Sequence, residues 1–212
     1  MLYFYKPNGR FMNETREYIL KTSLLLFLQK SYKEVTMREI VEKTGLSKGA
    51  FYHYFTSKEE LYKEIFYLIL SMGNVSYESF PQDSLKAFYQ HYIKITEEST
   101  RQLDQLFNTN SDGKLSLNLF LIMFEAMSKF PEFLTIEFGQ YKQGVEAWSK
   151  IIQTAKDSGE IVSESSNENI ANMFLFSTDG SFVRFLNHPE FKGEYTDFLK
   201  SAFETIYNNL KA

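Results

Sequence analysis

The 212-residue sequence contains no cysteine, three histidines, four prolines and a single tryptophan. Without cysteine the chain forms no disulfide, no thiolate metal site and no cysteine nucleophile. Its longest apolar runs, such as residues 24–28 and 119–124, are far shorter than the roughly 20 residues that a membrane-spanning helix needs. The first ten residues also lack the apolar stretch of a signal peptide, so we expect a cytoplasmic protein with no membrane partner.

Groups that carry catalysis are sparse as well. The three histidines are scattered, and no spaced carboxylate motif accompanies them, so we expect neither an enzyme nor a bound cofactor. The loop at residues 108–119 places oxygen-bearing side chains at EF-hand spacing. Leu119, however, stands where a calcium loop needs a bidentate glutamate. The sequence therefore predicts no metal site.

The charge is distributed unevenly along the chain. The net charge is −4, but residues 1–65 hold 11 Lys or Arg against 8 Asp or Glu, a balance of +3. The remaining residues carry 12 basic against 19 acidic side chains, or −7. Local cations displace counterions from phosphates, while an acidic body keeps a protein off random DNA. This asymmetry favours a DNA-binding head on an acidic body.

Residues 36–55 have the pattern of two short helices folded across a tight turn. Thr36 is a candidate N-cap, with Glu39 three residues later as in a capping box. Gly45 can take the positive φ that ends the first helix, and Ser47 can cap the second. A helix-turn-helix motif that reads a DNA major groove has this design.

The start of the second helix is small and carries one cation, Lys48, so its backbone can approach a flat surface. Phe51 and Phe55 are spaced to face a core, which leaves Tyr52, His53 and Tyr54 on the other sides. The alternative is a helical hairpin with solvated polar tips. For the helix caps and the turn glycine, a structural role alone would be sufficient. Three large rings beside a lysine at an exposed helix end fit that alternative poorly.

The rest of the chain shows helical periodicity and no strand pattern, which predicts an all-α fold. Residues 1–12 are expected to form a flexible arm, and residues 74–83 a polar linker broken at Pro81. Further helices are expected at residues 13–30, 57–72, 83–100, 102–107, 115–129, 132–158, 167–187 and 194–210.

Eleven residues carry a family resemblance: Gly45, Leu46, Ser47, Gly49, Tyr52, Tyr54, Phe55, Ser57, Lys58, Glu59 and Leu61. At this spacing, residues 14–66 resemble the N-terminal DNA-binding domain of the TetR family of bacterial transcriptional repressors. The resemblance implies a helix-turn-helix domain over residues 13–72 and a helical domain over residues 73–212. It further implies a homodimer on a double-stranded DNA operator and a small-molecule effector bound in the second domain.

Carried over by position, the resemblance and the exposed tip together predict nine DNA contacts. Lysine and hydroxyl donors suit phosphate oxygens, and a tyrosine ring can touch a thymine methyl group. The predicted contacts are Thr36, Ser47, Lys48, Gly49, Ala50, Tyr52, His53, Tyr54 and Lys58.

An effector cavity in a helical domain is lined by aromatic side chains with a few polar groups. The same rings fill ordinary helical cores, and any one of them is more often a core residue than part of a pocket wall. The candidate pocket residues are Phe88, Tyr92, Phe107, Phe120, Phe124, Tyr141, Trp148 and Phe174.

The last two helices carry apolar faces and small residues that let another helix approach closely. A two-fold interface is one interpretation, and cover for the chain's own core is the other. We favour the dimer because two heads must lie roughly 34–36 Å apart to reach successive major grooves. The candidate interface residues are Ser177, Gly180, Ser181, Phe198, Ala202, Phe203 and Ile206.

The leading hypothesis is a ligand-responsive repressor. It would bind a palindromic operator as a homodimer and be released by a small apolar or aromatic effector. The alternative is a DNA-binding regulator without an effector pocket, controlled by a partner protein or by its own concentration.

Overall fold

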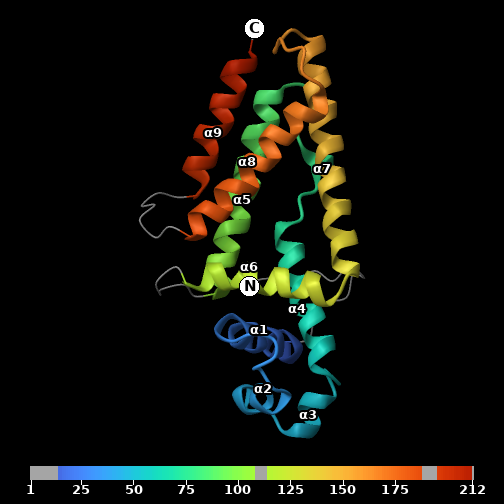
Figure 1. Ribbon diagram of the computed structural model, residues 1–212, viewed down its shortest axis with the longest axis vertical. Helices are drawn as coiled ribbons and strands as arrows, with labels where there is room; N and C mark the ends of the chain where they lie inside the picture. The colour runs from blue at the N-terminus through green and yellow to red at the C-terminus, as the bar shows by residue number, and fades with distance from the viewer. Residues whose placement is uncertain (1–13, 108–113, 188–194, 212) are drawn as a thin grey trace. The chain divides into compact units, whose positions relative to one another are not determined.

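The computed structural model describes residues 14–107, 114–187 and 195–211. Within them the chain is all-α, as predicted, and the one extended pairing there is an isolated bridge between Ile161 and Lys211. The predicted arm at residues 1–12 and residues 108–113 of the loop with EF-hand spacing lie outside the described residues. Figure 1 shows the elements α1 Glu14–Gln29, α2 Met37–Thr44, α3 Lys48–Tyr52, α4 Lys58–Gly73, the 3₁₀ turn η1 Tyr77–Ser79, α5 Leu85–Phe107, α6 Lys114–Lys129, α7 Glu132–Asp157, α8 Asn167–Asn187 and α9 Tyr195–Leu210.

The chain divides into two compact units. The first unit contains residues 1–73 and 103–133, and the second contains residues 74–102 and 134–212. The long helices α5 and α7 therefore contribute residues to both units. The division by function, with a DNA-binding domain over residues 13–72 and an effector and dimerisation domain over residues 73–212, stays a prediction.

The helix-turn-helix motif is built on a small apolar core in the first unit. Val35, Ile40, Phe51, Phe55 and Ile65 have no exposed surface. They come from α2, α3, α4, the turn before α2 and the turn between α3 and α4, so each of these helices places one apolar face inward. This burial fixes the orientation of α3.

Helix α6 is tied to the rest of the first unit by polar contacts. The Tyr62 hydroxyl on α4 donates to the Ile122 carbonyl on α6 at 3.2 Å. The Asn118 amide at the start of α6 donates to the Leu28 carbonyl at the end of α1. These bonds connect α6 to both α1 and α4.

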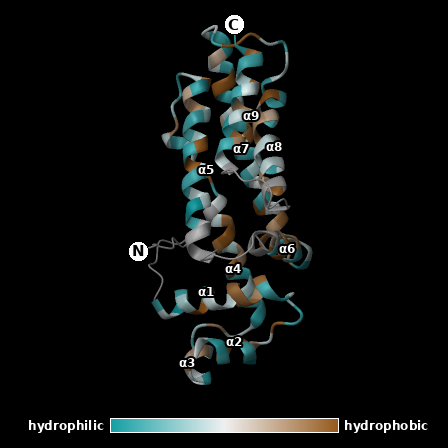
Figure 2. Cartoon of the chain, turned by 90° about the vertical axis from the view of Figure 1, so that its left-hand side faces the viewer, coloured by the Kyte–Doolittle hydropathy of each residue, from teal (hydrophilic) through white to brown (hydrophobic). Residues whose placement is uncertain are grey.

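In the second unit, α5, α7, α8 and α9 enclose an aromatic core, and α8 and α9 lie side by side in Figure 1. In Figure 2 hydrophilic and hydrophobic residues alternate along α5, as expected for a helix with one buried face. Gly159 ends α7 with a φ of 76°. The Glu160 carboxylate then accepts the backbone N–H groups of Leu85 and Lys86, at 2.8 and 2.9 Å, and so caps α5.

Two sequence predictions about this region are wrong. The predicted break between residues 100 and 102 does not occur, and α5 is one continuous helix. The Thr100 hydroxyl donates to the Thr96 carbonyl at 2.9 Å, so this side chain bonds within the helix instead of ending it. Residues 74–83 are also more than a polar linker, because Phe80 is 4% exposed and Tyr77 packs against the aromatic core.

Candidate nucleic-acid interface and effector sites

The turn of the helix-turn-helix motif has the caps that the sequence predicts. Thr36 has extended backbone angles, and its hydroxyl accepts the Glu39 backbone N–H at 3.1 Å. Gly45 adopts the left-handed region with φ 66° and ψ 7°, and its N–H donates to the Glu42 carbonyl at 3.3 Å. A side chain with a Cβ pays a steric cost at that φ, which is why glycine ends α2.

Helix α3 presents its N-terminal end to solvent. The Ser47 hydroxyl accepts the Ala50 backbone N–H at 3.2 Å, and Ser47, Lys48, Gly49 and Ala50 are all exposed. The opposite face is anchored by the buried Phe51. Backbone N–H groups and a cation at an exposed helix start form an anion-attracting surface that suits DNA phosphates.

The aromatic residues at the end of α3 differ in accessibility. Tyr52 is 36% exposed, and the Lys48 ammonium lies 6.0 Å from its ring centroid. His53 is exposed, whereas Tyr54 is half-buried and meets the His53 ring edge-on at 5.2 Å. Lys48, Tyr52 and His53 are therefore the more accessible of the predicted contacts here, and Tyr54 packs against His53.

Lys58 is engaged inside the first unit. Its ammonium donates to the carbonyls of Tyr32 and Val35, each at 2.7 Å, and lies 4.3 Å from the Tyr32 ring centroid. Burial lowers the pKa of Lys58, and the nearby Lys129 ammonium acts in the same direction. Two of its three N–H groups thus hold the turn between α1 and α2, and its contact with the DNA backbone stays a prediction.

Arg16 on α1 connects α4 to the core of the helix-turn-helix motif, and it is not among the residues predicted from the sequence. Its guanidinium forms a two-fold ion pair with Glu64 on α4 and lies 4.5 Å from the Phe55 ring centroid. Arginine suits this place because its planar fork binds a carboxylate while its face covers a ring. The partners are 48 residues apart, so local sequence carries no signal for the pair.

Four of the candidate pocket residues come together in the second unit. Phe88, Trp148 and Phe174 have no exposed surface, and Tyr92 is 7% exposed. Trp148 lies at their centre, with ring centroids 4.9 Å from Phe88, 5.4 Å from Tyr92 and 4.6 Å from Phe174. Such close ring contacts make this set a packed aromatic core.

The other four candidates lie elsewhere. Tyr141 is half-buried, and its hydroxyl donates to the Asn172 side chain at 2.8 Å. Phe120 and Phe124 belong to α6 in the first unit, and Phe124 is 62% exposed. Phe107 ends α5, and its side chain lies outside the described residues.

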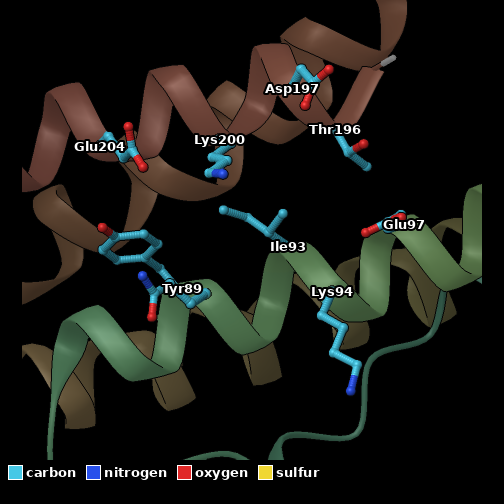
Figure 3. A pocket seen from close by; sticks show the side chains of 9 residues that line it. Tyr89, Ile93, Lys94, Glu97, Thr196, Asp197, Lys200 and Glu204 are labelled. Carbon is cyan, nitrogen blue, oxygen red and sulfur yellow. The ribbon is translucent and has the colours of Figure 1, made fainter.

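A polar groove of about 350 Å³ runs between α5 and α9, and no candidate pocket residue lines it. Figure 3 shows Lys200 pointing from α9 toward Ile93 on α5, whereas Lys94 points away. The acidic and basic side chains of the groove suit a polar guest better than an apolar one. In the sequence, charged residues spaced about one helical turn apart on α5 and on α9 are the signal for this groove. The groove is lined by Tyr89, Gln90, Ile93, Lys94, Glu97, Thr196, Asp197, Lys200 and Glu204.

The candidate interface residues of α8 and α9 fall into two groups. Gly180 and Phe198 are exposed, and Ser177, Ala202 and Ile206 are half-buried. Phe203 has no exposed surface and Ser181 is 7% exposed, so both face inward within this chain. Exposed apolar residues that the prediction omitted lie on α8: Met173, Phe176 and Val183.

The described residues contain neither a metal-binding cluster nor a membrane-spanning helix. Among those residues no three His, Asp or Glu side chains are grouped so as to hold a metal ion. No helix in the described part of the chain is both long and apolar enough to cross a membrane.

Comparison with known proteins gives consistent results. The family model of bacterial regulatory proteins of the TetR family matches residues 19–65. YfiR of Bacillus subtilis, described as an uncharacterized HTH-type transcriptional regulator, is 26% identical over 185 residues, 87% of this chain and 86% of its own length. The HTH-type transcriptional regulator AcrR of Shigella flexneri is 29% identical over 147 residues, covering 68% of this chain and 63% of AcrR.

Solved structures share the fold at low sequence identity. NalD of Pseudomonas aeruginosa, the secondary repressor of the MexAB-OprM multidrug efflux pump, superimposes with a TM-score of 0.63 at 16% identity, covering 93% of this chain and 96% of NalD. A TetR-family regulator from Agrobacterium tumefaciens gives a TM-score of 0.59 at 14% identity, with 93% and 98% of the two chains covered.

Proposed function

This chain belongs to the TetR family of bacterial transcriptional regulators, and from that premise we propose that it is a repressor released by a small effector. The family consists of DNA-binding regulators, not enzymes. In the proposal, a homodimer binds a palindromic operator, and a small apolar or aromatic effector in the second unit favours a conformation with lower DNA affinity.

The exposed start of α3 is the observation that carries the DNA-binding part. Lys48 and the backbone of Gly49 are exposed, while the buried Phe51 holds the same helix on the core. This anchoring of α3 matters because contacts to base edges require a helix that is held in one orientation. Six exposed predicted contacts in α3 and its caps, Ser47, Lys48, Gly49, Ala50, Tyr52 and His53, and the basic balance of residues 1–65 support this part of the proposal.

The experiment is selection of DNA fragments by the purified protein, followed by gel retardation at low salt. We expect an inverted repeat with half-sites one helical turn or a multiple apart. DNA from upstream of the protein's own gene provides a second probe. Retention of every fragment with equal affinity would contradict operator recognition.

The proposal of a homodimer rests on the exposed apolar residues of α8 and α9. Phe176 is 56% exposed and Phe198 is 51% exposed, and such large apolar side chains on neighbouring helices mark interaction surfaces. We expect a dimer by sedimentation equilibrium. Phe176→Asp is expected to shift the equilibrium to monomer, whereas Val162→Asp, at a 70% exposed residue outside the helices, leaves it unchanged.

Release by an effector is inferred from the family, in which ligand binding is typical, and the second unit holds the aromatic side chains that an apolar guest would contact. A thermal-shift screen of apolar and aromatic compounds tests it, because a ligand bound to the native state raises the melting temperature. Compounds that stabilise the protein are then added to the operator complex, where they are expected to release DNA. If stabilising compounds leave the complex intact, this part of the proposal is wrong.

A further inference from the structure

Trp148 contains a buried polar group that the packing does not explain. Its side chain has no exposed surface, yet the indole Nε1–H has no hydrogen-bond partner among the described residues. A buried donor without an acceptor lowers stability, so each such group needs a physical reason. An acceptor supplied by a ligand is one such reason.

The Tyr77 ring, from η1, lies against the same aromatic core. It is parallel to Phe88 within 3°, with ring centroids 6.1 Å apart, and to Tyr92 within 14° at 6.5 Å. Both centroid distances lie toward the long end of the range for aromatic pairs. The Tyr77 ring therefore lies against α5 without close stacking there, and its shortest ring contact is with Phe80, at 5.1 Å and tilted by 52°.

Gly144 on α7 makes room for the Tyr77 hydroxyl. A Cβ at residue 144 would lie 3.2 Å from that oxygen and 3.5 Å from the Leu175 side chain. An alanine here would press on the hydroxyl and shift it by a few tenths of an ångström. Because residue 144 has no side chain, the Tyr77 hydroxyl can lie against α7 at this point. Trp148 lies beside the same hydroxyl.

The electrostatics of this space favour a neutral phenol. Burial raises the pKa of Tyr77 to about 12, and the Asp179 carboxylate contributes in the same direction. The Trp148 side-chain N–H acts in the opposite direction, so it faces the phenol oxygen, although the pair does not complete a hydrogen bond of ordinary geometry. A phenol that is not attached to the chain could take a position in which its oxygen accepts this N–H with ordinary geometry.

We propose that the place of the Tyr77 ring is a binding subsite for a neutral, planar phenol whose oxygen accepts the Trp148 Nε1–H. Tyr77 occupies the subsite when no ligand is bound and leaves when the phenol enters. This inference rests on the proposed function, since it names the effector class. Tyr77 belongs to the segment that directly follows α4 in the chain, so its displacement moves residues attached to the end of that helix.

The test uses p-cresol, which is the tyrosine side chain without its backbone, and toluene, which lacks the hydroxyl. Trp148 is the only tryptophan, so its fluorescence reports directly on this subsite. We expect p-cresol to change the fluorescence saturably and toluene to bind at least tenfold more weakly. Tyr77→Ala is expected to tighten p-cresol binding about tenfold, because no side chain has to be displaced.

A glycine pair on α7 provides the matched control. Gly144→Ala is expected to weaken p-cresol binding, whereas Gly139→Ala, where a Cβ would meet nothing within 4 Å, leaves it unchanged. Trp148→Phe keeps an aromatic ring and removes the N–H. In a thermal-shift titration of that variant, p-cresol and toluene are expected to stabilise the protein equally.

The inference is wrong if neither the wild type nor a cooperatively melting Tyr77→Ala variant responds to p-cresol. Should Tyr77→Ala fail to fold, the two glycine variants decide, and equal p-cresol affinity in both overturns the subsite. Saturable p-cresol binding that leaves the operator complex intact supports the subsite and contradicts release by this effector. If a compound unrelated to phenol releases DNA without competing with p-cresol, the proposed function as an effector-released repressor is supported. The inference of a phenol effector is then contradicted.

Discussion

The Glu125 carboxylate on α6 accepts a hydrogen bond from the backbone N–H of Tyr32, in the turn between α1 and α2, at 3.0 Å. The two residues are 93 apart in the sequence. The Tyr62 hydroxyl lies 3.4 Å from the same carboxylate oxygen, and the Lys129 ammonium lies 4.7 Å from the Tyr32 ring centroid. Helix α6 therefore holds the turn that leads into the helix-turn-helix motif.

Replacing Glu125 tests this connection. Glu125→Ala is expected to lower the free energy of unfolding by about 1–3 kcal/mol, because the Tyr32 N–H loses its acceptor. Urea denaturation measures the loss. Glu42→Ala is the control, since Glu42 forms only an exposed ion pair with Arg38 and its loss is expected to cost less than about 1 kcal/mol. Equal losses in the two variants would contradict the role of Glu125.

Two glycines of the motif are expected to respond in opposite ways. Gly45→Ala is expected to lower stability by about 1–2 kcal/mol, because Gly45 has a φ of +66°. Gly49→Ala, inside α3 where a Cβ meets nothing within 4 Å, is expected to raise stability by about 0.5–1 kcal/mol. Thermal unfolding measures both changes.

The same Gly49→Ala variant is expected to bind operator DNA more weakly, because the added methyl group keeps the start of α3 from its closest approach to DNA. Gel retardation measures this effect. A stabilised variant with unchanged affinity would exclude Gly49 from the interface.

Lys48 is expected to act mainly through phosphate. Lys48→Ala should weaken binding to all DNA sequences by a similar factor and reduce the slope of log affinity against log salt by about one. Fluorescence anisotropy over a salt series measures the slope. Lys150→Ala, at an exposed residue of α7 in the second unit, serves as the control. A change in sequence preference with an unchanged slope would instead assign Lys48 to base recognition.

Titration of Tyr77 is expected to lower the free energy of unfolding at alkaline pH. Its pKa is raised to about 12 by burial, so the folded state keeps a proton that the unfolded chain loses near pH 10. The stabilisation is fully present below about pH 10 and is lost as pH rises toward 12. Tyr77→Phe is expected to reduce this loss by on the order of 1–3 kcal/mol.

Denaturation at a series of pH values measures that difference. Tyr32, Tyr62 and Tyr89 also have raised pKa values, so part of the alkaline loss remains in the variant. Identical profiles for the wild type and Tyr77→Phe would show that Tyr77 titrates alike in both states.

Local signals in the sequence predicted the helix-turn-helix motif well. Thr36, Gly45 and Ser47 act on backbone groups no more than three residues away, so their hydrogen bonds and dihedral angles follow from short-range chemistry. The family resemblance rests on the same segment, which the comparisons confirm.

Predictions about the rest of the chain depended on contacts between distant residues. Helical periodicity alone does not tell which face meets the chain's own core, and Phe203 proved to be fully buried instead of exposed for a partner. Burial of an aromatic side chain in a polar segment depends on partners beyond that segment, and the partners of Tyr77 include Phe88 and Tyr92 on α5.

The sequence by itself determined the family, the all-α fold and the caps of the DNA-reading motif, because these follow from patterns within a few residues. The tertiary structure alone decided that Lys58 turns to the carbonyls of Tyr32 and Val35, and that the Trp148 N–H is buried without a hydrogen-bond partner among the described residues. Both depend on which helices pack together, since the free energy of burying a charge or an N–H is set by neighbours from distant parts of the chain.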